Sequence, residues 1–171
     1  ANSDDLVEFG LDMETRHLRL RYRTVEHKMA LIDPDSIRQE PEMTDLELPN
    51  YAEIFSDDLQ EARKNVALVT DHLWIRGDDV AGEGELRFVG EGDTDRTILS
   101  YVGDDLERDD IHEDTESCFS VDYIADMDKP IPSGVVVGIE FGDEFPMILS
   151  WGAFEETLDV TYSLAPRITS E

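Results

Sequence analysis

Few residues of this chain have the types and spacing that chemistry needs. No histidine takes part in an H-E-x-x-H motif or another tight metal-binding spacing. The closest cluster is His112-Glu113-Asp114, which follows Asp109-Asp110. It lacks the ligand alternation and the central glycine of a calcium loop, so it favours a solvated acidic loop over a metal site.

Two further candidates for chemistry favour structural interpretations. Gly82-x-Gly84 lacks the strand-to-helix context of a phosphate loop and predicts a hairpin turn. Cys118, beside Phe119 at the start of an expected helix, favours packing over nucleophilic catalysis. A metal-dependent hydrolase that uses clustered carboxylates remains an alternative, but no spacing supports it. We therefore expect no catalytic residue, no metal and no cofactor.

Basic residues are scarce, so their positions carry information. Four arginines fall between Arg16 and Arg23, where they suit the solvated face of a strand. Arg63 and Lys64 lie on the polar side of one expected helix, and Lys129 ends another. Charges on the polar face of a helix are usually only solvated, so these residues alone do not indicate nucleic-acid binding.

Acidic residues dominate the composition. The chain has 171 residues, with 42 Asp plus Glu against 14 Lys plus Arg, and a formal net charge of -28. Disorder is disfavoured because the acids alternate with periodic apolar patterns. At molar salt the Debye length falls to about 3 Å, which removes most of the self-repulsion. The composition therefore predicts an intracellular protein of a halophile, in a high-salt cytosol, with no membrane span.

The apolar periodicity predicts an α+β fold with many short strands. One helix carries a stripe of Phe55, Leu59, Ala62, Val66 and Val69, with Ser56 as its N-cap. A second helix over 118–128 carries Phe119, Tyr123 and Met127. Glycines 82, 84, 90 and 92 are expected in turns. Strands are expected at 6–11, 17–23, 26–32, 46–55, 72–76, 85–89, 96–102, 134–141, 146–150 and 157–164.

The sequence predicts a connector that divides the chain into two domains. Three strands without a helix occupy 1–32, which leaves one face of that sheet bare. Residues 33–48 have no periodicity and contain Pro34 and Pro41, yet they keep the apolar Ile37 among charged neighbours. Residues 49–171 form a more complete second domain that also ends in three strands.

Three segments together resemble the DNA sliding clamps, the proliferating cell nuclear antigen family, in its haloarchaeal members. They are MALIDPDSIRQEPE before the connector, FSVDYIADMDKPIP at the second helix and TYSLAPRI near the end. The resemblance implies a ring of three subunits, each with two similar domains, with sheets outside and two helices per domain lining a hole. Only the terminal strands of the first domain, 1–32, would then be present, and we expect the sequence to be a fragment.

The family's role implies partners and no catalysis. A sliding clamp encircles duplex DNA and tethers DNA polymerase, flap nuclease, DNA ligase and its loader, which bind through a short peptide with a Gln and an aromatic pair. The resemblance places that peptide under the connector. The residues expected to line its groove are Ile37, Pro41, Pro146, Ala165, Pro166, Arg167 and Ile168.

The resemblance also implies DNA-facing and subunit-contacting residues. Lys64, Lys129 and Arg63 would face DNA, although Asp57 and Asp122 stand where relatives often carry basic residues. Subunits would join through two exposed edge strands, at about 25–31 and 85–90. The residues expected at that interface are Val25, His27, Met29, Leu31, Glu85, Arg87 and Val89. The alternative is a truncated clamp-like module that binds partner peptides without encircling DNA.

Overall fold

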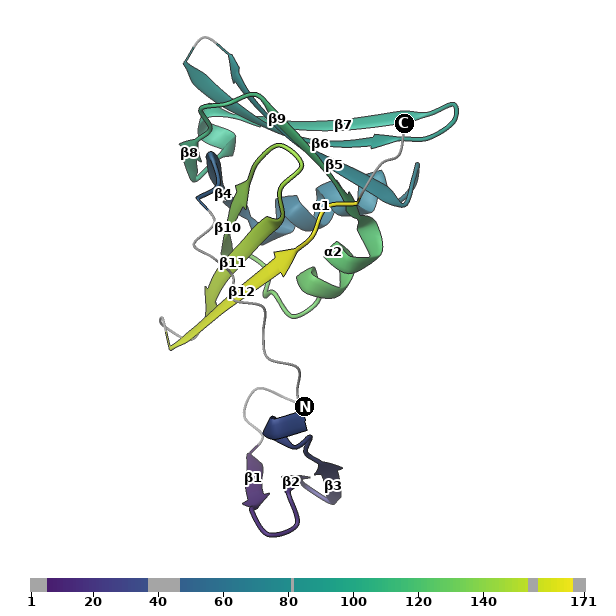
Figure 1. The fold of residues 1–171 in the computed structure, drawn as a ribbon, viewed down its shortest axis with the longest axis vertical. Helices are drawn as coiled ribbons and strands as arrows, with labels where there is room; N and C mark the ends of the chain where they lie inside the picture. Colours follow the sequence, from purple (N-terminus) through teal and green to yellow (C-terminus); the bar gives the residue numbers. More distant parts are fainter. Residues whose placement is uncertain (1–5, 37–46, 81, 154–156, 168–171) are drawn as a thin grey trace. The chain divides into compact units, whose positions relative to one another are not determined.

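Alternating apolar residues build a small antiparallel sheet in the first part of the chain (Figure 1). The computed structural model describes residues 6–36, 47–80, 82–153 and 157–167, and the chain divides into two compact units, Ala1–Leu46 and Glu47–Glu171. The first unit has the strand order β1-β2-β3. Its strands are β1 (Val7–Asp12), β2 (His17–Tyr22) and β3 (Val25–Ala30), followed by the short 3-10 turn η1 (Pro34–Ser36).

One face of this first sheet is apolar and open. Leu11 pairs with Leu18, which pairs with Met29, so the three side chains share a face. Leu11 is 56% exposed and Phe9, two residues before it on the same face, is 72% exposed. The bare face expected from three strands without a helix is therefore present among the described residues of this unit.

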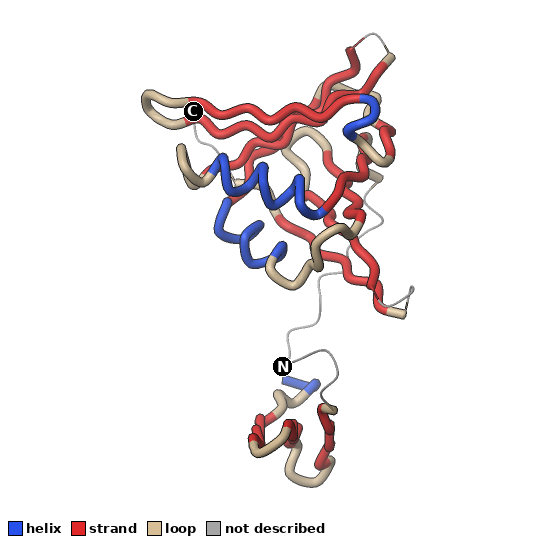
Figure 2. Tube along the Cα trace, turned by 180° about the vertical axis from the view of Figure 1, so that it is seen from behind, coloured by secondary structure: helices blue, strands red, loops and turns tan. Residues whose placement is uncertain are grey.

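The second unit combines two antiparallel sheets with two helices (Figure 2). The five-stranded sheet consists of β12 (Leu158–Leu164), β11 (Met147–Ala153), β10 (Val136–Phe141), β4 (Asn50–Phe55) and β8 (Arg108–Asp110), in that order. The four-stranded sheet consists of β7 (Arg96–Val102), β6 (Glu83–Glu91), β5 (His72–Val80) and β9 (Thr115–Ser120), in that order. The helices α1 (Ser56–Val66) and α2 (Val121–Asp128) lie side by side, and the 3-10 turn η2 (Gly103–Asp105) follows β7.

A single core joins the sheets and the helices of this unit. Leu59, Ala62 and Val66 are almost fully buried, so the stripe predicted for the first helix is confirmed in its middle. Burying each large aliphatic side chain stabilises the folded state by about 1.5–3 kcal/mol, and this burial holds α1 against the sheets. The largest buried side chains around it include Phe88, Phe119, Phe141, Ile54, Leu73, Ile75, Leu86, Ile139 and Leu149.

The ends of both helices differ from the prediction. Ser56 is the first residue of α1 rather than its cap, and its hydroxyl donates to the carbonyl of Pro132 at 2.8 Å. The second helix begins at Val121, and Cys118 and Phe119 belong to the strand β9. Of the stripe predicted for this helix, Phe119 is buried and Met127 packs against the core, but Tyr123 is 63% exposed and Ile124 is buried instead.

Two of the glycines expected in turns lie inside β6. A Cβ at position 84 would stand 2.0 Å from Oδ1 of Asp109, and one at position 90 would stand 2.9 Å from Cγ1 of Val66. These glycines therefore allow close packing of the strand against its neighbours. Gly82 does lie in the turn between β5 and β6, with a φ of 90° that suits glycine, so the hairpin interpretation is confirmed.

Candidate functional site

The acidic loop around His112 is organised by a buried asparagine. The side-chain carbonyl of Asn50 accepts hydrogen bonds from the backbone N–H groups of His112 and Glu113, at 2.9 and 3.1 Å. Its amide donates to the carbonyl of Glu113 and the hydroxyl of Thr115, both at 2.8 Å. Among the described residues no group of three or more His, Cys, Asp or Glu side chains is placed to hold a metal ion.

Pro146 and the segment after β12 lie close together at one edge of the five-stranded sheet. Met147 pairs with Leu164, so Pro146 and Ala165 leave adjoining strands one step beyond that pair. Pro146 and Pro166 are half-buried and Ala165 is exposed. Of the residues expected to line a groove, these three are brought together, whereas Ile37, Pro41 and Ile168 lie outside the described residues.

Arg167 fixes the end of the described chain against the four-stranded sheet. Its backbone N–H donates to the carbonyl of Cys118 in β9 at 2.7 Å. Its Nη1 lies 3.3 Å from Oδ2 of Asp71, and Oδ1 of the same carboxylate lies 2.6 Å from Nδ1 of His72. We name residues Leu164 to Arg167 the tail. The tail is thus held by β9 and by Asp71, the residue just before β5, and the sequence predicts neither contact.

The surface formed by the two helices carries few available cations. Nε of Arg63 lies 2.6 Å from Oδ2 of Asp128, and only 18% of the Arg63 side chain and 3% of the Asp128 side chain are exposed. Lys129 bonds Oδ1 of Asp126 at 2.6 Å, and this hydrogen bond raises the pKa of Lys129. Lys64 is exposed on α1. The positive charge of Arg63 is therefore committed to a contact between the helices.

Acidic residues on the same two helices add negative charge to a surface that has few available cations. Oδ1 of Asp57 accepts the hydroxyl of Ser133 and Oδ2 accepts the N–H of Gly134, both at 2.7 Å. The bond from Ser133, followed by that from Gly134, lowers the pKa of the Asp57 carboxyl. Asp122 and Asp126 are exposed on α2. The helix surface is thus net negative at neutral pH.

The structure corrects the expected edge strand of the second unit. β6, which contains Glu85, Arg87 and Val89, is paired with β5 on one side and with β7 on the other. It therefore has no free edge, and the side chain of Val89 is fully buried. Among the described strands, β7 is one edge of this sheet and β9 is the other, and Ile98 on β7 is 46% exposed.

The expected edge in the first unit is confirmed. β3 pairs only with β2 among the described strands, and it ends the order β1-β2-β3. His27 is exposed, and Val25, Met29 and Leu31 are 46, 44 and 42% exposed. Unpaired backbone groups on such an edge are available for pairing with another strand.

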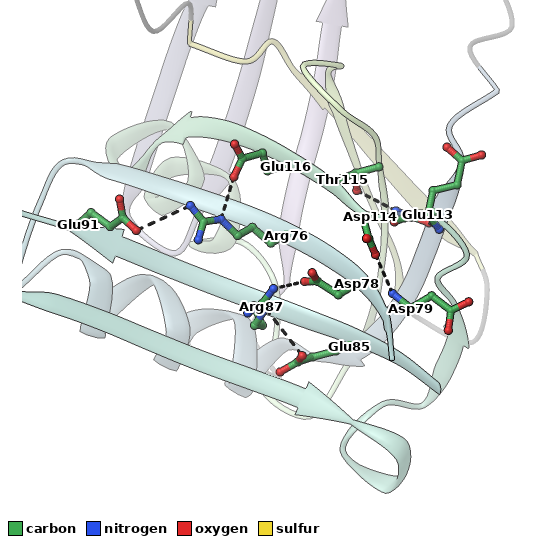
Figure 3. A network of polar contacts seen from close by, with 11 residues as sticks. Arg76, Asp78, Asp79, Glu85, Arg87, Glu91, Glu113, Asp114, Thr115 and Glu116 are labelled. Carbon is green, nitrogen blue, oxygen red and sulfur yellow. Dashed lines mark hydrogen bonds and ion pairs between the residues drawn. The ribbon is translucent and has the colours of Figure 1, made fainter. Parts of the chain in front are cut away.

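The charged residues expected at the interface instead form a network within their own sheet (Figure 3). Arg87 pairs with Asp78 of β5, and its Nε lies 3.8 Å from Oε2 of Glu85. On the same sheet Nε of Arg76 lies 3.0 Å from Oε2 of Glu116, and its Nη2 lies 3.7 Å from Oε1 of Glu91. These contacts join β5, β6 and β9 side by side.

Sequence reasoning missed two residues near the tail. Phe145 precedes Pro146 and is 46% exposed, an unusual position for a large aromatic ring. Asp71 stands in an unremarkable Thr-Asp-His run and gave no signal in a chain with so many acids. An aromatic–proline pair beside a turn could have drawn attention to Phe145.

No helix in the described ranges is long and apolar enough to cross a membrane.

The architecture matches that of known DNA clamps. Proliferating cell nuclear antigen (PCNA) from Archaeoglobus fulgidus, solved with the C-terminal region of FEN-1 bound, superposes with a TM-score of 0.85 at 31% identity, over 99% of this chain and 67% of that one. PCNA from Thermococcus kodakaraensis superposes with a TM-score of 0.80 at 22% identity, which bears on the fold alone. Sheets backed by two adjoining helices therefore define a protein of the sliding-clamp fold.

Sequence comparison identifies the family. The DNA polymerase sliding clamp of Halobacterium salinarum is 41% identical over 173 residues, covering 99% of this chain and 68% of the relative. That of Haloarcula marismortui is also 41% identical, over 172 residues, covering 100% of this chain and 68% of the relative. No family model matches the sequence. The chain belongs to the DNA polymerase sliding clamp family, and the resemblance noted in the sequence is confirmed.

Proposed function

We propose that this chain is a subunit of a DNA sliding clamp that encircles duplex DNA as a ring and tethers replication and repair enzymes. The observation that carries the proposal is its 41% identity to haloarchaeal sliding clamps over nearly its whole length. The relatives extend beyond the span matched here, so the ring is proposed for the complete subunit. On this account the protein has no catalytic activity of its own, and its partners supply the chemistry.

The partner site is proposed at Pro146 and the tail. Exposed Phe145 and Ala165, with half-buried Pro146 and Pro166, offer apolar and aromatic surface beside one another. A partner peptide with a Gln and an aromatic pair would place its rings there, with Ile37, Pro41 and Ile168 completing the site. Anchors of this kind can each contribute a few kcal/mol to binding. A flap nuclease, polymerase, ligase or loader would use the same surface.

The subunit contact is proposed between β3 and β7. Both are edge strands with exposed apolar side chains, Val25 and Met29 on β3 and Ile98 and Val102 on β7. Antiparallel pairing between copies would satisfy the free backbone groups of both edges. Repeating such a heterologous contact closes a ring when the rotation between copies is right.

The acidic helix surface shapes the proposed contact with DNA. Lys64 and Lys129 would face the phosphates, and Arg63 is left out because Asp128 neutralises it. With Asp57, Asp122 and Asp126 on the same helices, direct neutralisation of phosphate would be weak. The ring would hold DNA topologically, with solution cations between the two negative surfaces, which suits a high-salt cytosol.

Sedimentation and DNA retention test the ring. The complete subunit containing this chain should sediment in molar KCl with the mass of three subunits. After loading, it should stay on nicked circular DNA and leave when that DNA is cut. A complete subunit that remains a monomer while still binding partner peptides would instead support the alternative, a peptide-binding module without a ring.

A further inference from the structure

One residue at the end of the tail is held by both its backbone and its side chain. The N–H of Arg167 bonds the carbonyl of Cys118 at 2.7 Å, and its guanidinium lies 3.3 Å from the carboxylate of Asp71. The first contact draws the tail along β9, and the second ties it to the start of β5. Figure 1 shows the yellow end of the chain reaching β9 and the start of α2.

Asp71 is itself fixed from two other directions. Its backbone carbonyl accepts the N–H of Val121, the first residue of α2, at 3.0 Å. Its Oδ1 lies 2.6 Å from Nδ1 of His72. His72 and Arg167 therefore each contact a different oxygen of this carboxylate. Partial desolvation raises the pKa of Asp71, but the charges of His72 and Arg167 and the hydrogen bonds from both outweigh that effect and lower the pKa.

Cys118 is covered on the side of its sheet that faces away from the core. Ser117 and Phe119 point into the core, so Cys118 shares the opposite face of β9 with exposed Glu116. Yet Cys118 is only 3% exposed and does not belong to the hydrophobic core of the unit. Burial raises the pKa of its thiol, and the nearby Arg167 guanidinium opposes that rise. Arg167, in the tail, is thus close enough to Cys118 to influence its thiol.

We propose that Asp71 is a positioning residue for the partner-peptide site. By holding Arg167 it keeps the tail closed over Cys118 and presents Ala165 and Pro166 in one arrangement. The inference rests on the proposed function, because the segment that Asp71 positions is the one proposed to receive the peptide. Positioning the tail before binding lowers the entropy that the peptide complex must lose.

The ion pair between Asp71 and Arg167 contributes little to the stability of the domain, so its positioning role can be tested without unfolding the protein. The side chains of Arg167 and Asp71 are 41 and 68% exposed, and exposed ion pairs typically contribute about 0.2–1 kcal/mol to stability. Removing the pair should therefore open the tail without unfolding the domain. Cys118 reports on the opening, because it is the only cysteine in the chain and every thiol signal comes from it.

The experiment compares D71N with the control D104N in the full chain, in molar KCl. Asp104 is an exposed acid in η2, at the end of the four-stranded sheet opposite Asp71, and its replacement removes the same charge away from the tail. We expect D71N to raise the reaction rate of Cys118 with a disulfide reagent about two- to five-fold. Its Kd for a labelled peptide with a Gln and an aromatic pair should weaken by a similar factor. D104N should change neither, and both variants should unfold within about 1 kcal/mol of the parent.

Two controls complete the test. Losing the charge of Asp71 also eases ionisation of the thiol, so the limiting rate at high pH is compared as well as the rate at one pH. A double-mutant cycle with R167M should show that D71N has no further effect once Arg167 is gone. Equal rates in D71N and D104N, or additive effects in the cycle, would overturn the role of Asp71. If the parent binds no peptide, the proposed site fails, while the labelling rates still decide whether Asp71 holds the tail.

Discussion

Nε of Arg63 lies 2.6 Å from Oδ2 of Asp128, and this ion pair joins α1 to α2. Asp128 is only 2% exposed, so Arg63 rather than water compensates its carboxylate. Breaking a buried pair from one side leaves an uncompensated charge. Arg63→Ala should therefore lower the free energy of unfolding by about 3 kcal/mol, measured by denaturant unfolding in molar KCl.

Lys64→Ala is the matched control for that experiment. Lys64 is the next residue on α1 and is exposed, so its removal should change the free energy of unfolding by less than about 0.5 kcal/mol. Equal losses for the two variants would mean that the Arg63–Asp128 pair does not hold the helices together.

The edge of the four-stranded sheet predicts where copies of the subunit meet. Ile98→Lys in β7 places a charge on the exposed edge strand and should reduce the fraction of trimer formed by the complete subunit. Val80→Lys, at the end of β5, alters a valine that is 57% exposed and should leave assembly unchanged. Sedimentation in molar KCl measures both. If Val80→Lys impairs assembly as much as Ile98→Lys, then β7 has no special role.

The acidic helix surface predicts an unusual dependence on salt. Ordinary DNA affinity falls as salt rises because counterions are released, whereas retention of this clamp on circular DNA should improve with KCl. Replacing Asp122 and Asp126 by Lys should add low-salt affinity for a short linear duplex, and that affinity should fall as KCl rises. The control Asp93→Lys, which alters an exposed residue in the turn after β6, should not add affinity for the duplex. Best retention at low salt in the parent would contradict this account.

The raised pKa values of two tyrosines predict that part of the tyrosine ionisation occurs late in an alkaline titration. Burial, helped by the hydrogen bond to Glu53, raises the pKa of Tyr51 to about 12, and burial likewise raises that of Tyr101 to about 12. Both values lie above the ordinary 10.0, so the folded state holds these protons more tightly than the unfolded state. Their stabilising contribution is complete below pH 10 and is lost as the pH rises through about 12.

Tyrosinate absorbance checks this titration. The double variant Y51F/Y101F should lose the late step, whereas Tyr123→Phe, which alters a ring that is 63% exposed, should keep it. Persistence of the late step in the double variant would show that neither ring is the source. The free energy of unfolding of the parent, followed over the same range, should fall as the step proceeds.

Local patterns predicted most strands and the middle of α1, because burial of one face leaves a periodic signal. Leu59, Ala62 and Val66 follow that period and are buried. β9 was missed because its run Thr-Glu-Ser-Cys-Phe-Ser is polar and merges with the helix that follows. The alternation of apolar and polar residues also does not tell whether a strand lies at the edge or in the middle of its sheet. The strand over 85–90 alternates as an edge strand would, but its place between β5 and β7 depends on distant pairing.

The candidate site was predictable only where family likeness supplied it. Pro146, Ala165 and Pro166 carry no periodic signal, and the resemblance named them before the structure placed them together. The contact from Arg167 to Asp71 joins residues 96 positions apart, and nothing local to either residue predicts it. The resemblance places Arg63 among the DNA-facing residues, whereas its buried partner Asp128 is not visible in the sequence.

Binding of a partner peptide tests the central claim most directly. A labelled peptide with a Gln and an aromatic pair is titrated with this chain in molar KCl and followed by fluorescence anisotropy, with circular dichroism to confirm folding. The account predicts saturable binding that is lost in Pro166→Asp and kept in the control Thr94→Asp, which alters an exposed residue in the turn between β6 and β7. A folded chain that does not bind, or binding that survives Pro166→Asp, would contradict the proposed partner site.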